Sequence, residues 1–234
     1  MRLIKKIGSK FQALYFIIRL RINGMWGLPA QTKKEIRILK TVFDHFAGKK
    51  KIKIFEWGSG FSSIYYAQYL KKKNAEFEWH SIDNNKVWHE KIVFQVKKKQ
   101  LMQHVRLYCK EFIPFWEKPD WGLVPPKCGF FGPKSENEKN YIMFPKLLNE
   151  KFDILIIDAR FRRLCLQAAK EVLLPEGVVI LHDAQKSHYH PGLEDFRYSK
   201  FFITGAWYPF QNVLNKLWIG SMGNSRIFDV LNRL

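Results

Sequence analysis

The sequence predicts one α/β domain on a seven-stranded, mostly parallel sheet that is flanked by helices and closed by an antiparallel last strand pair. Three observations lead to this fold class. Short apolar runs alternate with helix-like segments from residue 52 onward, which favours right-handed crossovers and a parallel sheet. Several of these runs end in an acidic residue or precede one. Near the C-terminus, strands predicted at 201–206 and 217–222 have no clear helix between them, which indicates a hairpin.

The chain begins with a basic amphipathic segment. Apolar residues recur at roughly helical spacing among lysines and arginines over residues 1–22, and we assign 1–30 to this N-terminal segment. Such a helix can lie on an anionic membrane surface or pack on its own domain. Thr32 and Glu35 then form a capping box, which predicts a helix that runs to about Phe46.

The main domain, residues 31–234, carries the alternating elements. Strands are predicted at 52–56, 77–82, 104–109, 153–157 and 177–182, with helices at 61–72, 86–99 and 161–173. Residues 111–140 interrupt this order with prolines among aromatic residues. Because long loops in compact domains are usually functional, we expect this aromatic insertion to help select the substrate.

The composition limits which classes of partner and which cellular compartment are to be expected. Forty Lys and Arg residues against 21 Asp and Glu give a net charge of +19, which favours phosphate-bearing partners such as nucleic acid, anionic lipid or phosphorylated glycans. Cys109, Cys128 and Cys165 show no paired spacing, so we expect neither a disulfide framework nor a metal cluster. No early apolar run is long enough to span a bilayer. These features predict a cytoplasmic protein.

A glycine turn follows the first predicted strand, in the run Glu56-Trp57-Gly58-Ser59-Gly60. The two glycines let the backbone turn sharply and approach a ligand, and the N–H groups that open the next helix face the same point. The acidic residue places negative charge where a pyrophosphate would need positive charge. We therefore expect a cationic or zwitterionic ligand, which disfavours a dinucleotide-binding dehydrogenase.

Four carboxylates stand at or just after the ends of predicted strands: Glu56, Asp83, Asp158 and Asp183. The carboxyl ends of parallel strands meet at one edge of a sheet, where ligands bind. Asp83 follows Gly60 by 23 residues, a spacing at which an acid can accept hydrogen bonds from ribose hydroxyls. Any one of these carboxylates could be a simple cap, but together they indicate a site.

This arrangement resembles the class I S-adenosylmethionine-dependent methyltransferases, which have a Rossmann-like fold, over about residues 32–222. The resemblance implies an enzyme with S-adenosylmethionine as its cofactor and with Asp83 on the ribose. At the amino-acid end of the cofactor it implies Glu56, Gly58, Ser59, Gly60, Ser62 and Ser63. Many members carry a third glycine where this chain has Ser63, whose small side chain still fits a helix start.

Two loops are expected to flank the transferred methyl group, one beginning at Asp158 and one at His182-Asp183. They resemble methyltransferases whose fourth strand ends in Asp-Gly-Arg and whose fifth ends in His-Asp, a group often found among sugar and small-molecule methylating enzymes. The catalytic candidates are Asp158, Arg160, His182 and Asp183. His182 could be a general base, and Arg160 or Arg162 could orient an anionic substrate. Alternatively, these residues only cap a loop and begin a solvated helix.

We do not expect a bound metal ion. The alternative is a bound Mg²⁺ ion. Asp158 and Asp183 match positions that hold magnesium in metal-dependent O-methyltransferases, and two carboxylates can anchor such an ion. Those enzymes commonly carry another Asp or Asn after the second acid, whereas this chain has Ala184. His188 and His190 lack further ligands at suitable spacing, which disfavours zinc.

The acceptor class follows from what comes after the fourth strand. Amino-methylating members of the fold carry an Asn or Asp, two prolines and an aromatic residue there, and Asp158-Ala159-Arg160-Phe161 lacks that clamp. We therefore expect an O-methyltransferase that acts on a carbohydrate, a glycan or another small acidic hydroxyl compound. Two alternatives stay open. One is an RNA methyltransferase that uses the basic charge and the aromatic residues, and the other is a non-catalytic cofactor-binding interaction module.

Lysine triplets occur at 49–51, 71–73 and 97–99. All are predicted at the amino edge of the sheet, away from the cofactor. They either complement helix dipoles and aid solubility, or they dock on an anionic membrane together with the N-terminal segment. The second interpretation predicts a protein peripheral to the membrane.

Overall fold

The computed structural model describes residues 28–112, 133, 135–205, 214–223 and 226–234. The basic N-terminal segment and most of the aromatic insertion lie outside this set, so the expectations for them stay predictions. None of the helices within these ranges is long and apolar enough to cross a membrane.

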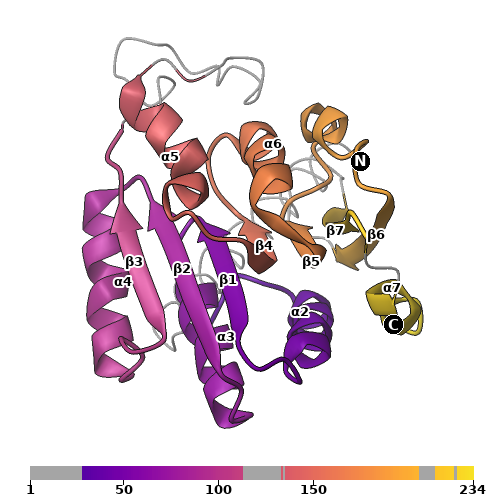
Figure 1. Ribbon diagram of the computed structural model, residues 1–234, viewed down its shortest axis with the longest axis horizontal. Helices are drawn as coiled ribbons and strands as arrows, with labels where there is room; N and C mark the ends of the chain where they lie inside the picture. The colour runs from indigo at the N-terminus through magenta and orange to yellow at the C-terminus, as the bar shows by residue number, and fades with distance from the viewer. Residues whose placement is uncertain (1–27, 113–132, 134, 206–213, 224–225) are drawn as a thin grey trace, which may run out of the picture.

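One sheet of seven strands, in the order β3-β2-β1-β4-β5-β7-β6, organises the described chain (Figure 1). The strands from β1 to β5 pair in parallel, and β7 lies antiparallel between β5 and β6. The strands are β1 (Ile52–Trp57), β2 (Phe77–Asp83), β3 (Val105–Cys109), β4 (Phe152–Ile157), β5 (Leu173–Leu181), β6 (Tyr198–Gly205) and β7 (Asn215–Ser221). This arrangement confirms the predicted fold class.

Helices cover both faces of the sheet. One face carries α2 (Lys33–Phe46), α3 (Phe61–Lys72), α4 (Lys86–Lys98) and α7 (Arg226–Leu231), and the other carries α5 (Glu136–Leu147), α6 (Arg162–Val172) and the 3-10 helix η2 (Ser187–Gly192). Side chains of a strand alternate between faces, so Ile54 packs in the α2 and α3 layer while its neighbour Phe55 packs in the α5 and α6 layer. Burial from both sides explains why all six residues of β4 are buried.

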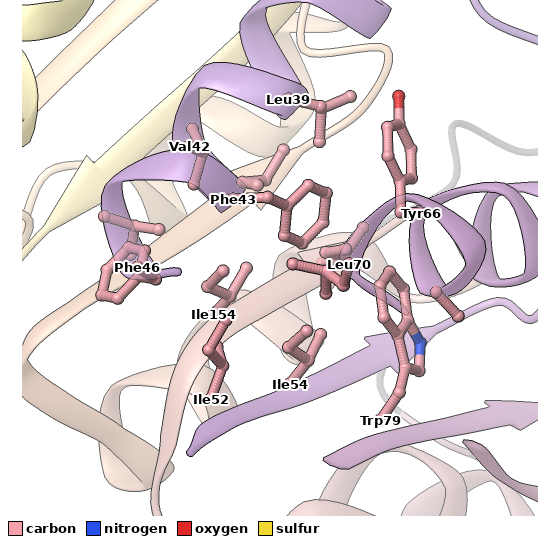
Figure 2. Packing of buried hydrophobic residues seen from close by; sticks show 14 of the residues in the cluster. Leu39, Val42, Phe43, Phe46, Ile52, Ile54, Tyr66, Leu70, Trp79 and Ile154 are labelled. Carbon is pink, nitrogen blue, oxygen red and sulfur yellow. The ribbon is translucent and has the colours of Figure 1, made fainter. Parts of the chain in front are cut away.

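Helix α2 is held to the sheet by its apolar stripe. Figure 2 shows Phe43 of α2 among Tyr66, Leu70 and Trp79, with ring centroids 5.0 Å from Tyr66 and 5.7 Å from Trp79. The predicted capping box at the start of this helix is present, because the Thr32 side chain accepts from the backbone N–H of Glu35 and the Glu35 side chain accepts from that of Thr32. The helix therefore starts where the sequence predicts it.

Several elements differ from the sequence prediction, which included no helix at η2 or α7. Strand β5 begins at Leu173, inside the range predicted as helix. Helix α5 begins at Glu136, inside the range 111–140 that we expected to be a loop. A capping box between Ser135 and Glu138 starts α5, and this sequence signal stands directly after a run rich in prolines and aromatic residues.

Candidate active site

The turn after β1 requires glycine at position 58. Gly58 has a φ of 93°, and a Cβ built there would lie 2.2 Å from the backbone oxygen of Asp158. Its N–H donates to the carbonyl of Ile82 at 2.8 Å. The backbone therefore turns sharply at Gly58, as the glycine motif predicted, and the turn is wedged between the ends of β2 and β4.

Glu56 lies within β1 rather than at its end, and its carboxylate is fully buried. It accepts hydrogen bonds from the side chains of Ser62 (2.9 Å), Ser63, Ser81 (3.0 Å) and Trp79 (3.1 Å). Burial raises the pKa of Glu56 to about 7, against the opposing effect of these donors. Glu56 thus ties the start of α3 to β2.

The residues that were predicted to contact the amino-acid end of the cofactor fall into two groups. Ser62 and Ser63 turn their hydroxyls toward Glu56, and none of these three residues lines the cavity described below. Gly58 does line it. Ser59 presents its carbonyl to Trp88, and Gly60 is the N-cap residue of α3.

A cavity of about 360 Å³ opens at the carboxyl edge of the sheet. It is lined by Gly58, Asp83, Asn84, Asn85, Trp88, Tyr141, Asp158, Ala159, Arg160 and Arg162. The location is the ligand crevice of an open parallel sheet. The structure therefore brings the predicted ribose acid Asp83 and the predicted catalytic residues Asp158 and Arg160 into one cavity.

Asp83 ends β2 and is 8% exposed. Its carboxylate accepts from the backbone N–H of Asn85 at 2.8 Å, and burial raises its pKa from the ordinary value. Asn85 caps α4, and the ring N–H of Trp88 donates to the carbonyl of Ser59 at 2.7 Å. The cap and this bond fix the wall of the cavity beside the glycine turn.

Asp158, His182 and Asp183 come together beside the cavity, as predicted. His182 Nδ1 lies 3.3 Å from an oxygen of Asp158 and 3.7 Å from one of Asp183. On the other side of the ring, Nε2 lies 3.4 Å from Glu35 of α2. Arg162 bridges the two aspartates, with Nη2 at 2.8 Å from Asp158 and Nη1 at 3.2 Å from Asp183.

The charges of this cluster balance one another. Burial opposes the charged form of His182, but the carboxylates of Asp158, Glu35 and Asp183 outweigh it and raise the pKa of His182 well above its ordinary value. Burial also acts against ionised Asp158, and His182 and Arg162 outweigh it and lower the pKa of that carboxyl. The flanking carboxylates thus favour the protonated form of His182, which disfavours its expected role as a general base.

The cluster was also tested for fit to a divalent cation. Atoms of Asp158, His182 and Asp183 lie close enough together to be ligands of one ion. However, the Arg162 guanidinium already pairs with both aspartates, and Ala184 stands where a further acid would be needed. Mg²⁺ would have to displace a buried arginine from between its own ligands, so these residues do not fit it.

The other sequence candidates lie outside the cluster of Asp158, His182 and Asp183. Arg160 is exposed at the mouth of the cavity. His190 in η2 lies 3.1 Å from the carbonyl of Ala184, and neither it nor His188 belongs to a ligand group found in the described ranges. Cys109 and Cys165 are free thiols.

Sequence reasoning missed several residues of the site. Glu35 was assigned only a capping role, yet it also accepts from Thr204 at 3.0 Å and faces His182. A capping residue that lies far from the site in sequence gives no local signal of such a second contact. Tyr141 lies on the unpredicted helix α5, and Asn84, Asn85 and Trp88 directly follow Asp83, a place where cofactor contacts could have been sought.

The fold and the cavity define a Rossmann-like α/β domain with a ligand crevice at its carboxyl edge. A family described as a methyltransferase domain has a sequence model that matches residues 55–184, more than half of the 234 residues. The chain therefore belongs to this methyltransferase family, whose class uses S-adenosylmethionine as cofactor. No curated protein matches the sequence.

Solved structures agree on the fold. A Klebsiella pneumoniae structure assigned as an O-methyltransferase gives a TM-score of 0.55 at 13% identity, covering 89% of this chain and 90% of that one. The O-methyltransferase TomG from Streptomyces achromogenes, solved with S-adenosylmethionine, gives 0.54 at 12% identity over 93% and 96%. A Staphylococcus aureus structure assigned as a caffeoyl-CoA O-methyltransferase gives 0.52 at 12% over 93% and 98%.

Identities this low establish the fold and not the substrate. The chain also spans only 57% of a spermidine synthase from Thermotoga maritima and 47% of a citrinin polyketide synthase domain. The acceptor must therefore be argued from this chain's own residues.

Proposed function

We propose that this protein transfers the methyl group of S-adenosylmethionine to an oxygen atom of a small acidic acceptor, with a carbohydrate or glycan as the favoured class. One observation carries the proposal. Asp83 and Asp158 line the same cavity, which continues to the exposed side chain of Arg160. The cavity thus combines a ribose acceptor, a carboxylate for the reacting group and a cation at its mouth.

The cofactor is expected to place its ribose at Asp83 and its methionine part near Gly58. Carboxylates suit the sulfonium and ammonium charges of this ligand, whereas they would repel a pyrophosphate. Trp88 and Tyr141 supply apolar wall for the adenine. This placement follows from the lining residues and the family's class of cofactor.

Methyl transfer forms a bond between the acceptor oxygen and the methyl carbon while the bond from that carbon to sulfur breaks. Held at Gly58 and Asp83, S-adenosylmethionine would supply an electrophilic methyl group and leave as S-adenosylhomocysteine. The acceptor's hydroxyl proton passes to the Asp158 carboxylate, whose side chain is 37% exposed, and then to solvent. His182, whose protonated form the flanking carboxylates favour, holds Asp158 in position and takes no proton itself.

The charge balance of the site predicts metal-independent transfer. Arg162 and His182 supply the positive charge that Mg²⁺ would bring to Asp158 and Asp183. A chelator is expected to leave the rate unchanged, and added Mg²⁺ is expected not to raise it. A rate that falls with chelator and returns with Mg²⁺ would contradict this assignment.

The test measures S-adenosylhomocysteine formation by mass spectrometry with pools of glycans, small acidic hydroxyl compounds and RNA. We expect turnover with a hydroxyl acceptor, and at least a tenfold loss in Asp158→Asn with retained cofactor binding. Asp195→Asn is the matched control, because Asp195 lies on the surface with a 64% exposed side chain. Turnover on RNA alone would contradict the proposed acceptor. Cofactor binding without turnover on any pool would favour a non-catalytic module.

We also infer a cytoplasmic protein that contacts anionic membrane. The lysines at 49–51, 71–73 and 97–99 support this inference, although Lys49, Lys51 and Lys73 are engaged by acidic residues of the domain itself. The N-terminal segment is the second proposed element of this contact. A comparison of vesicle binding by the chain with and without residues 1–22 tests this membrane contact.

A further inference from the structure

Helix α4 carries an unusual outer face. Val87 is 78% exposed and Phe94 is 62% exposed, and both are large apolar side chains. They stand seven positions apart, so they lie on one side of the helix, and Lys91 and Lys98 fall on the same line. We call these four residues, Val87, Lys91, Phe94 and Lys98, the α4 stripe.

The core does not use Val87 or Phe94, whereas the ammonium of Lys91 lies 5.1 Å from the centre of the Trp88 ring. The opposite side of α4 supplies the core contacts, through the buried residues Ile92 and Val96. In Figure 1, α4 lies beside β3, which is an edge strand of the sheet formed by the described residues. A helix packed through one face commonly keeps its other face polar, and here that face is apolar and cationic instead.

We propose that the α4 stripe docks on an anionic lipid bilayer. Lys91 stands between Val87 and Phe94 in the sequence, lysines 97–99 follow Phe94 at the end of the helix, and Glu90 is the acidic residue on this exposed side. Amphipathic helices with lysines around aromatic and aliphatic residues bind such surfaces in the interfacial plane. Each lysine near the surface contributes about 1 kcal/mol. The net charge of +19 favours the same partner over a neutral bilayer.

Two other occupants fit the stripe less well. A second copy related by a two-fold axis would bring the same lysines toward each other, and like charges repel. A nucleic acid would meet the lysines favourably, but Val87 has no ring on which a base could stack. An aliphatic side chain exposed between lysines is better suited to the boundary between headgroups and acyl chains.

Docking along α4 would also orient the cavity. The helix begins at Lys86, directly after the lining residues Asn84 and Asn85, and its third residue Trp88 lines the cavity as well. Its other end reaches the amino edge of the sheet about 20 Å away. The cavity mouth would therefore lie near the bilayer surface, within reach of an acceptor carried on a lipid. This last step rests on the proposed methyl transfer, whereas the docking itself does not.

The test is co-sedimentation of the full chain with vesicles of phosphatidylcholine alone and of equal parts phosphatidylcholine and phosphatidylglycerol. The first variant is Val87→Ser with Phe94→Ser, and the second is Lys97→Glu with Lys98→Glu. Each is expected to weaken binding to the anionic vesicles at least tenfold, from the apolar area or the lysine charge that is lost.

Matched controls change residues of the same kind elsewhere. Leu147→Ser removes an apolar residue that is 63% exposed at the end of α5, and Lys33→Glu with Lys34→Glu reverses two exposed lysines on α2. Both controls are expected to bind like the wild type. Thermal unfolding and calorimetry with S-adenosylhomocysteine check that each variant keeps its fold and its cofactor site.

The outcomes are distinct. Wild-type binding by the stripe variants, or equal losses in stripe and control variants, would overturn the proposal. Loss of binding only on removal of residues 1–22 would assign the contact to the N-terminal segment instead. Vesicle binding that persists in a protein without methyl transfer would separate this inference from the proposed function.

Discussion

At the scale of single residues, Glu56 shows how burial changes a carboxylate. A residue that ends a strand would face the cavity, but β1 continues to Trp57, and the alternation of side chains puts Glu56 on the same face as Ile52 and Ile54. That face packs against α3, whose first turn supplies Ser62 and Ser63 as donors. Counting strand parity from the buried isoleucines could have predicted this direction.

Glu56→Ala is expected to lower the free energy of unfolding by about 1–3 kcal/mol at low pH, because buried donors lose their acceptor. Burial raises the pKa of Glu56 from 4.5 to about 7 in the folded state. The contribution of protonated Glu56 to the free energy of unfolding is thus fully present below pH 4.5 and is lost as pH rises through about 7. In urea unfolding, the stability that Glu56→Ala loses relative to the wild type should be larger at about pH 5 than at about pH 8.

The control for Glu56 is Glu76→Ala, which removes an exposed carboxylate on the approach to β2. Its effect should be small at both pH values. A Glu56→Ala deficit that grows toward alkaline pH would contradict the burial account.

At the scale of elements, α2 joins the start of the domain to the site. Its Glu35 completes the capping box with Thr32, accepts from Thr204 of β6 and faces His182 beyond β5. The strands and the crossover helices α3, α4 and α6 could be predicted within a few residues, because continuous apolar runs and capping residues are local signals, whereas α5 was missed. The position of Glu35 against His182 depends on packing between distant elements, which no local pattern records.

Thr32→Ala is expected to cost about 1 kcal/mol of stability, because the backbone N–H of Glu35 loses its acceptor. Thr41→Ala on the same helix is the control, since the Thr41 hydroxyl only donates to the carbonyl of Arg37 one turn earlier. Urea unfolding of both variants measures the difference. Equal midpoints for the two variants would show that the cap contributes nothing.

At the scale of the whole molecule, the parallel strands bring residues far apart in sequence to one edge. Asp83 comes from the end of β2, Asp158 follows β4 and Asp183 follows β5, and Figure 1 shows these strands running side by side with β1. The parallel topology therefore explains why the sequence alone could predict that these carboxylates lie together. The bridging role of Arg162 could not be predicted in the same way, because it depends on the direction of one side chain at the start of α6.

The central claim is that the cavity holds an adenosyl cofactor through Asp83. Calorimetric titration of the wild type and of Asp83→Ala with S-adenosylhomocysteine, and of the wild type with NAD, tests it most directly. We expect binding of S-adenosylhomocysteine by the wild type, at least tenfold weaker binding by Asp83→Ala, and no heat with NAD. Binding of NAD alone, or unchanged affinity in Asp83→Ala, would contradict it.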